Sequence, residues 1–361
     1  GAADRLTGGN VAASTDGYAL AFNVRAGDAD VMGDDARGGA DTLTAGNLSV
    51  AWAGSGDYAD GYAINMMAGD SFVMYDDAVA GNDTLTGGLA TFTGSDGYSG
   101  DGYGVALNIF AGDTFDLEGA ATLGNDKLTG TSVAAGSDGY AINIMAGDSM
   151  DSLPFLLSGS IDDFTPSSFT ETLGALDIGS GDYDYDGIQY GNDTITGGNG
   201  QAMNMMVGDG YSMGSYDTGG NDRIQAGSGL AENMLIGDAW YAYGAQGGND
   251  TLISSTSDDV MFGDFASGDG TGGMDRFIFA PSNGEDTIVD FEVGVDKIDL
   301  IALKANPQLR SYAVMLSSNR LIDTGDDIVL HLGTSAASSD NIVTLVGVDN
   351  ASDLMNSFIF V

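Results

Sequence analysis

The sequence predicts an all-β fold: a parallel β-roll, or β-solenoid, with lengthened turns and a C-terminal β cap. Three observations predict it. Two short motifs alternate along residues 1–275, Gly and Asp are concentrated in these motifs, and short segments of alternating apolar residues separate them. A strand–turn–strand–turn unit cannot bury its apolar face alone, but stacked copies build a continuous core. We therefore expect each coil to contain two short strands and two turns.

The acidic composition indicates bound cations. The 361 residues carry 53 acidic and 10 basic side chains, a formal charge of −43, and all but five of the acids are Asp. Asp is the short carboxylate that suits tight turns and the oxygen shell of a metal. A disordered acidic tail would be poor in apolar residues, whereas this chain is 43% hydrophobic. A halophilic surface would lack the fixed spacing. Because so much acid in a compact fold repels itself, we expect the cations to be structural.

The first half-motif is a glycine turn followed by Asp, any residue, and Leu or Ile. Ala3-Asp4-Arg5-Leu6 is a weaker first copy. The clear copies place aspartates at Asp41, Asp83, Asp126, Asp193, Asp222 and Asp250, with turn glycines that include Gly81, Gly191, Gly220 and Gly248.

The second half-motif ends in Gly-Asp and carries an Asn five positions earlier. Its aspartates are Asp28, Asp70, Asp113, Asp148, Asp209 and Asp238. A last copy ending at Asp264 keeps the turn but has Asp259 in place of the Asn. The two half-motifs alternate strictly, so equivalent aspartates should stack at the spacing of adjacent strands, ~4.8 Å.

Alternation along the strands predicts which residues form the core. Leu43, Leu85, Leu128, Ile195, Ile224 and Leu252 would form one inward column, and Ile64/Met66, Leu107/Ile109, Ile142/Ile144 and Met203/Met205 the facing one. The outward positions would then hold a ladder of Asn side chains and a second column of Arg25, Met67, Phe110, Met145, Met206 and Leu235. An exposed apolar column must be covered by the inserted loops or by another subunit. If another subunit covers it, Met67, Phe110, Met145 and Met206 form an assembly surface.

The motif Gly248-Asn249-Asp250-Thr251-Leu252 resembles the end of the glycine-rich nonapeptide of the RTX family of calcium-binding β-rolls. The resemblance implies that turn carbonyls and turn aspartates bind several Ca²⁺ ions between successive coils. The implied ligands are the aspartates of both half-motifs from Asp28 to Asp264, Asp275, and the turn glycines Gly81, Gly191, Gly220 and Gly248. The full nonapeptide is rarely intact, and many turns are lengthened.

Changes in this pattern divide the chain into four parts. Residues 1–148 form a roll with long inserts, residues 149–190 an insertion or arm, residues 191–274 a roll of shorter coils, and residues 275–361 a β cap. Asp-Gly-Tyr inserts in the first part indicate turns, with further calcium ligands as the alternative.

The cap resembles the C-terminal module of RTX proteases, on Asp275-Arg276-Phe277-Ile278-Phe279 and the segments that follow. That module caps the roll and carries an uncleaved type I secretion signal with an apolar ending, which Ser357-Phe358-Ile359-Phe360-Val361 fits. The resemblance implies passage through a type I exporter, an extracellular or cell-surface location, and Val361 as the native C-terminus. The N-terminus shows no signal peptide or initiator Met, so we expect the chain to be cut from something longer.

The sequence lacks the residues that several classes of function require. There is no Cys, a single His (His331), and no metalloprotease, serine-hydrolase or phosphate-loop motif, so we do not expect an enzyme. The negative charge argues against nucleic acid, and no apolar run predicts membrane insertion.

Two functions stay open. The first is a secreted calcium-binding structural protein that assembles with itself or attaches to the cell surface, as a surface layer, adhesin or fibre. The alternative is the calcium-folding and export region of a larger secreted hydrolase. Interrupted Thr-x-Thr columns make ice binding a minor alternative, because the β-propensity of Thr also explains them.

Overall fold

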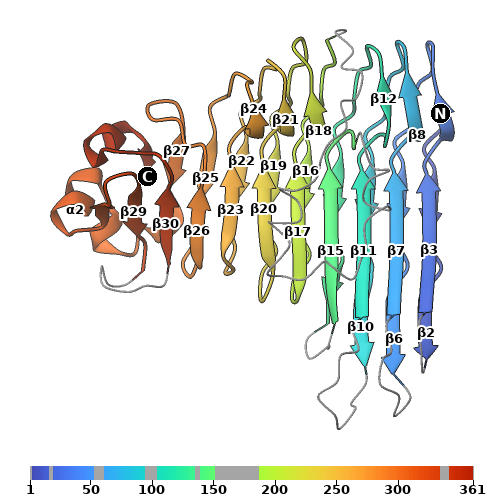
Figure 1. The fold of residues 1–361 in the computed structure, drawn as a ribbon, viewed down its shortest axis with the longest axis horizontal. Helices are drawn as coiled ribbons and strands as arrows, with labels where there is room; N and C mark the ends of the chain where they lie inside the picture. The colour runs from blue at the N-terminus through green and yellow to red at the C-terminus, as the bar shows by residue number, and fades with distance from the viewer. Residues whose placement is uncertain are drawn as a thin grey trace.

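The computed structural model describes residues 2–15, 19–52, 61–93, 104–134, 139–150, 187–333 and 341–360. The chain winds into a stack of coils whose strands run parallel from coil to coil (Figure 1). The predicted fold class, an all-β parallel roll, is confirmed. No helix in the described ranges is both long and apolar enough for a membrane span.

Sheet A runs along the whole roll, because every coil contributes one short strand to it. Its strands, in spatial order, are β1 (Arg5–Thr7), β5 (Thr42–Thr44), β9 (Thr84–Thr86), β13 (Lys127–Thr129), β16 (Thr194–Thr196), β19 (Arg223–Gln225), β22 (Thr251–Ile253), β25 (Arg276–Ile278), β27 (Lys297–Asp299) and β31 (Phe358–Ile359).

Sheet C faces sheet A across the coil. It is parallel in the strands β3 (Ala19–Ala26), β7 (Gly61–Ala68), β11 (Gly104–Ala111), β15 (Gly139–Ala146), β17 (Ala202–Val207), β20 (Glu232–Ile236), β23 (Asp259–Phe262), β26 (Glu285–Ile288) and β30 (Ile342–Leu345). It ends in two antiparallel strands, β29 (Ile328–His331) and β28 (Leu321–Asp323).

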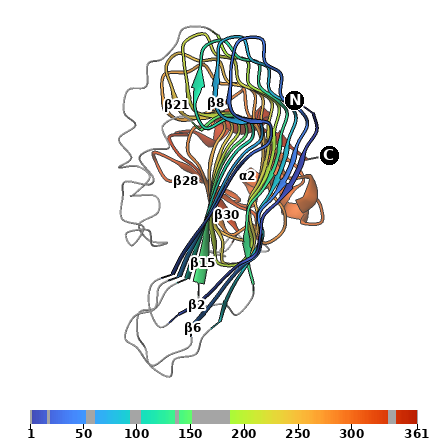
Figure 2. The same cartoon turned by 90° about the vertical axis from the view of Figure 1, so that its right-hand side faces the viewer.

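Three small sheets make the coils larger than the predicted two strands and two turns. Sheet B contains β2 (Val11–Thr15), β6 (Leu48–Trp52), β10 (Leu89–Thr93) and β14 (Ser132–Val133); sheet D contains β4 (Ala29–Met32), β8 (Ser71–Tyr75) and β12 (Leu117–Glu118); sheet E contains β18 (Gly210–Met213), β21 (Ala239–Ala242) and β24 (Phe265–Gly268). The first coils therefore have four strands, because the lengthened turns form strands of their own. Viewed along the stack, β8 and β21 lie in the upper lobe, and β2 and β6 in the lower extension (Figure 2).

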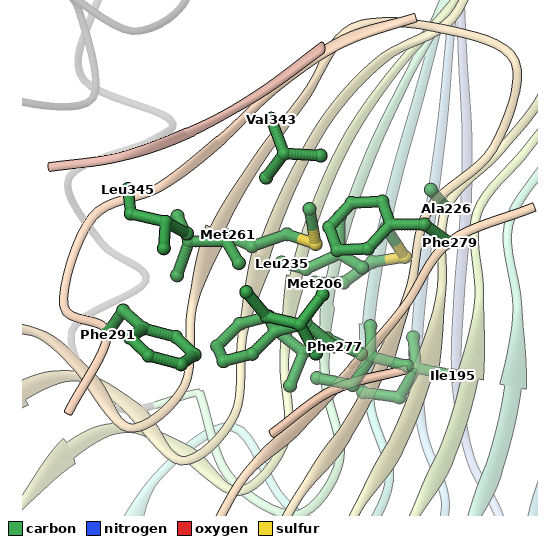
Figure 3. Close-up of a cluster of buried hydrophobic side chains, with 14 of the residues drawn as sticks. Ile195, Met206, Ala226, Leu235, Met261, Phe277, Phe279, Phe291, Val343 and Leu345 are labelled. Carbon is green, nitrogen blue, oxygen red and sulfur yellow. The ribbon is translucent and has the colours of Figure 1, made fainter. Parts of the chain in front are cut away.

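The core between sheets A and C contains the predicted Leu and Ile column. Leu43, Leu85, Leu128, Ile195, Ile224 and Leu252 are all fully buried there. The facing side of sheet C was predicted wrongly. Met67, Phe110, Met145 and Met206, expected outside, are fully buried in this same cluster, as is Leu235. Figure 3 shows Met206, Leu235 and Met261 beside Ile195 and Phe277.

The residues predicted to face inward from sheet C lie on its other face. Ile64, Ile109, Ile144 and Met205 belong to a separate buried cluster, which also contains Phe115, Met150 and Tyr211 from the segments after the Gly-Asp turns. Both faces of these strands are thus covered within the chain. Apolar residues occupy both faces of these strands, so periodicity alone could not show which face points into the core between sheets A and C.

The predicted Asn ladder exists, but it points into the core. The side-chain amide nitrogen of Asn108 donates to the Oδ1 atom of Asn143 at 3.1 Å, and that of Asn143 donates to Asn204 at 2.8 Å. Asn143 also bonds both the N–H and the C=O of Thr131 across the coil. Because neighbouring rungs and the backbone satisfy these amides, burying them carries little penalty.

The C-terminal region first extends the roll and then closes its end. β25, β27 and β31 extend sheet A, and β26 and β30 extend sheet C, so these sheets run without a break across the expected boundary at residue 275. The closing elements are β28, β29, α2 (Tyr312–Ser317) and the 3-10 turns η3 (Ile301–Leu303), η4 (Pro307–Leu309) and η5 (Ala351–Asn356). The expected arm over residues 149–190 falls mostly outside the described residues, as do most of the Asp-Gly-Tyr inserts.

Candidate metal centre

The predicted aspartates form two parallel columns along the roll. The A-side column lies where the chain enters sheet A: Asp4, Asp41, Asp83, Asp126, Asp193, Asp222, Asp250, Asp275 and Asp296. The C-side column lies where the chain leaves sheet C: Asp28, Asp70, Asp113, Asp148, Asp209, Asp238, Asp264 and Asp290. Asp4, Asp290 and Asp296 were not among the predicted ligands. The sequence does carry a signal for Asp4 and Asp296, since each is followed by any residue and then Leu or Ile.

Each A-side aspartate is tied to the next coil by its own backbone. The N–H of Asp83 donates to the Oδ1 atom of Asp126 at 2.6 Å, and the N–H of Asp126 donates to the Oδ1 atom of Asp193 at 2.5 Å. The same bond repeats from Asp4 to Asp296, across coils of 21 to 67 residues. From Asp41 to Asp296, one carboxylate oxygen of each A-side residue therefore accepts a backbone bond from the preceding coil, whatever the length of the coil.

The C-side aspartates accept from the turn glycines. The N–H groups of Gly81 and Gly191 donate to the Oδ2 atoms of Asp70 and Asp148 at 2.6 and 2.7 Å. Gly220 bonds Asp209 and Gly248 bonds Asp238 in the same way. These four glycines were predicted to offer carbonyl ligands. The structure shows them as amide donors that orient the carboxylates, and the role of their carbonyls stays a prediction.

The two columns converge on repeated carboxylate triads. Two A-side residues from successive coils and one C-side residue bring one oxygen each to within 4.8 Å of one another. The triads are Asp4/Asp28/Asp41, Asp41/Asp70/Asp83, Asp83/Asp113/Asp126, Asp126/Asp148/Asp193 and Asp193/Asp209/Asp222. Oxygens on opposite sides of one Ca²⁺ lie about 5 Å apart, so each group has the size of a single calcium shell.

The second carboxylate oxygens test whether a cation fits. The Oδ2 atoms of Asp41, Asp83, Asp126, Asp193, Asp222, Asp250 and Asp275 are buried and have no hydrogen-bond partner, and so are the Oδ1 atoms of Asp70, Asp113 and Asp148. Buried charged oxygens without partners are strongly unfavourable. Hard, oxygen-only donors of this kind are what Ca²⁺ prefers, so the residues fit the ion that the sequence predicts.

Burial and mutual repulsion raise the pKa values of these carboxyl groups. Burial, followed by the charge of Asp70, raises the pKa of Asp83 to about 8. Burial, followed by Asp264, raises the pKa of Asp275 to about 9. The pKa values of Asp113, Asp126 and Asp193 also lie well above the ordinary range, again mainly through burial. Without a cation the folded site therefore favours protonated carboxyl groups near neutral pH.

The glycine of each Gly-Asp turn leaves room for this arrangement. A Cβ atom on Gly112 would overlap the carbonyl oxygen of Gly147 and the Oδ2 atom of Asp126. Gly69, Gly147 and Gly208 meet the equivalent oxygens of their own neighbouring coils. The close approach of backbone to carboxylate therefore requires Gly at this position.

Comparison with known proteins identifies the C-terminal part of this stack. Residues 209–359 match the family model described as Peptidase M10 serralysin C terminal. Residues 209–359 are a serralysin-type C-terminal module. The matched module starts at Asp209 and includes the last three coil-to-coil aspartate bonds, which end on Asp250, Asp275 and Asp296. Searches of curated proteins and of solved structures found no match.

The serralysin-type module is a calcium-binding β-roll of the RTX kind, which confirms the predicted resemblance. It is distinct from the catalytic part of such a peptidase, so the module is not itself the enzyme. The first four triads, from Asp4/Asp28/Asp41 to Asp126/Asp148/Asp193, lie before the matched range, and the fifth, Asp193/Asp209/Asp222, reaches into it.

Proposed function

We propose that this chain is a secreted calcium-folding roll, which leaves the cell unfolded through a type I exporter and folds outside when Ca²⁺ fills its aspartate triads. The observation that carries the proposal is the stack of buried carboxylates whose second oxygens have no partner. A column of such charges cannot stay closed without cations. The serralysin-type module supports the export step.

Ion-coupled folding gives export its direction. The unfolded chain does not hold the ligands of one ion close together. The free energy of binding the ions therefore also stabilises the folded state. Low cytosolic calcium keeps the chain extended for the exporter, and millimolar calcium outside folds it. The coil-to-coil bonds from Asp4 to Asp296 couple the sites, since each A-side aspartate from Asp41 to Asp193 belongs to two successive triads.

Small-angle X-ray scattering during a calcium titration tests this proposal. We expect an expanded chain in chelator, with a radius of gyration near the ~70 Å of an unfolded chain of this length, and a compact rod in millimolar calcium. Magnesium at the same concentration should not compact the chain, because Mg²⁺ requires a smaller octahedral shell. A compact rod in chelator at pH 8 would refute the proposal.

The biological setting has two candidates. The serralysin-type module favours a calcium-folding and export region within a larger secreted hydrolase. Sequencing the natural protein upstream of Gly1 distinguishes it from a structural protein: a hydrolase motif there supports the first, and further repeats support the second.

Assembly with other copies or with the cell surface is the other proposal, and it needs a different surface from the one predicted. Met67, Phe110, Met145 and Met206 are buried, so they offer nothing to a partner. Sedimentation velocity of the calcium-loaded protein over a range of concentrations tests for it.

A further inference from the structure

The outward face of sheet A carries basic side chains, whereas the chain as a whole is strongly acidic. The middle residue of each strand from β5 to β27 is buried, so the first and third residues point outward. The strand register aligns the first residues in one column: Arg5, Thr42, Thr84, Lys127, Thr194, Arg223, Thr251, Arg276 and Lys297. The third residues form a second column: Thr7, Thr44, Thr86, Thr129, Thr196, Gln225, Ile253, Ile278 and Asp299.

Five of the ten basic residues of the chain lie in the first column, and one acid, Asp299, lies in the second. The rest of the chain holds 52 acidic residues. Arg276 pairs with Asp299, and Lys297 donates to the backbone carbonyls of Val295 and Asp296. Arg5, Lys127 and Arg223 are exposed, and no ion pair holds them within the described residues.

These cations are not simply counter-charges for the metal column. Lys127 and Arg223 directly follow Asp126 and Asp222, but successive residues of a strand point to opposite faces. The two carboxylates are buried inside the coil, while the two cations are exposed outside it. The face is therefore a separate surface, positively charged and free of carboxylates over the coils from β1 to β22.

Spacing and neighbouring groups indicate the ligand. Lys127, Arg223 and Arg276 stand on every second coil, which places them ~10 Å apart. One disaccharide of an extended polysaccharide covers a similar length. Hydroxyl groups of Thr194 and Thr251 lie between the cations. An exposed Asn ladder runs alongside, in which Asn192 donates to Asn125 at 2.9 Å and Asn221 to Asn192 at 3.0 Å.

We propose that this outward face of sheet A binds a linear anionic polysaccharide, aligned with the roll axis. Lys127 and Arg223 bind successive carboxylate or sulfate groups, and the fork of Arg223 takes two oxygens of one group. Between these groups, the Thr hydroxyls and the exposed ladder of Asn125, Asn192 and Asn221 hydrogen-bond the sugar hydroxyls. An acidic protein is a poorer occupant, because the face lacks the aromatic and Met side chains that anchor protein interfaces.

The inference goes beyond calcium-driven folding and depends on it only in requiring a folded roll. Hyaluronan, with one carboxylate in each disaccharide, is the probe, and binding is measured by fluorescence anisotropy in millimolar calcium. The double variant Lys127→Thr/Arg223→Thr places in the column the residue that its neighbours Thr84, Thr194 and Thr251 already carry. The matched control, Lys304→Thr/Arg310→Thr, removes two exposed cations outside sheet A. Circular dichroism of the same samples verifies the fold.

We expect the wild type and the control to bind hyaluronan but not neutral dextran, and the double variant to bind roughly tenfold more weakly with its fold intact. Rising salt should weaken wild-type binding. Failure of the folded wild type to bind, or equal binding by the double variant, would overturn the proposal without touching the calcium account. So would poly-glutamate binding as tight as hyaluronan binding and equally sensitive to the double variant, since that result identifies an acidic polypeptide as the occupant.

Discussion

Each buried A-side aspartate combines two tasks in one short side chain. The Oδ1 atom of Asp126 accepts the N–H of Asp83, while its Oδ2 atom is buried and has no partner. The first contact sets the register between coils, and the second leaves a charged ligand that the protein itself does not satisfy. Glu would be one methylene too long for both at once, which explains the preference for Asp.

Asp126→Asn separates these tasks, because the amide oxygen keeps the backbone bond and loses the charge. Asp126 belongs to two triads, so we expect weaker calcium binding at two neighbouring sites. The free energy of unfolding in calcium should fall by about 3–5 kcal/mol, the range for breaking a buried charge pair. Calcium titrations and thermal melts measure both effects. Asp326→Asn, in an exposed turn, is the control, and equal behaviour of the two variants would contradict the assignment of Asp126.

Gly112→Ala tests the close approach of backbone to carboxylate. The added Cβ atom would overlap the Gly147 carbonyl and Asp126, so both the stacking and the triad must distort. We expect a loss of more than about 2 kcal/mol in chemical denaturation with calcium present. Gly9→Ala is the matched change, since no atom lies within 4 Å of the added methyl group there, and its effect should stay within about 0.5 kcal/mol. A stable Gly112→Ala protein would show that the turn has spare room.

At the scale of the strands, the sequence predicted much of the roll. The alternating half-motifs gave the parallel stack and the Leu43 to Leu252 column, because one face of each sheet A strand is plainly apolar and the other polar. Sheet C strands such as Gly104–Ala111 are apolar on both faces, so their orientation depends on what covers each face. Phe115 and Tyr211, which pack on the outer face, come from turns whose path the pattern does not fix.

Most of the site residues could also be predicted from the sequence. Fourteen of the seventeen column aspartates were predicted from the motifs, and the other three are Asp4, Asp290 and Asp296. Asp290 was missed because the chain has no Gly before it, although its carboxylate accepts the N–H groups of Gly263 and Asp264. The grouping of two A-side residues with one C-side residue needs the coil geometry, which motif spacing does not contain.

Met145→Lys tests the corrected orientation of sheet C. Met145 is fully buried between sheets A and C, so we expect the charge to destabilise the calcium-loaded fold by more than about 3 kcal/mol. Gln225→Lys places the same charge on the exposed face of sheet A and should leave the melting temperature nearly unchanged. If Met145→Lys melted with the wild type, the side chain would have to lie outside the core.

For the molecule as a whole, protons and calcium are alternative ways to neutralise the same columns. The folded pKa values of Asp70, Asp83 and Asp275, about 7, 8 and 9, lie above the ordinary Asp value. The calcium-free fold thus binds more protons than the unfolded chain. Its stability is greatest in acid and is lost as pH rises through about 7 to 9.

Calcium-stripped protein should therefore show a β signal and a melting transition at pH 5 that are absent at pH 8, while calcium-loaded protein should lose far less stability over that range. Calcium binding at pH 7 should also release protons, which a weakly buffered titration with a pH indicator would record. A calcium-free protein that became more stable from pH 5 to pH 8 would contradict the raised pKa values of the columns.

The central claim is that divalent ions close the aspartate stack, and thermal melting followed by far-ultraviolet circular dichroism at pH 8 tests it most directly. With millimolar calcium we predict a strong β signal and a cooperative transition that moves to higher temperature as calcium rises. With excess EGTA we predict no β signal and no transition. The same spectrum and the same melting temperature under both conditions would contradict the account.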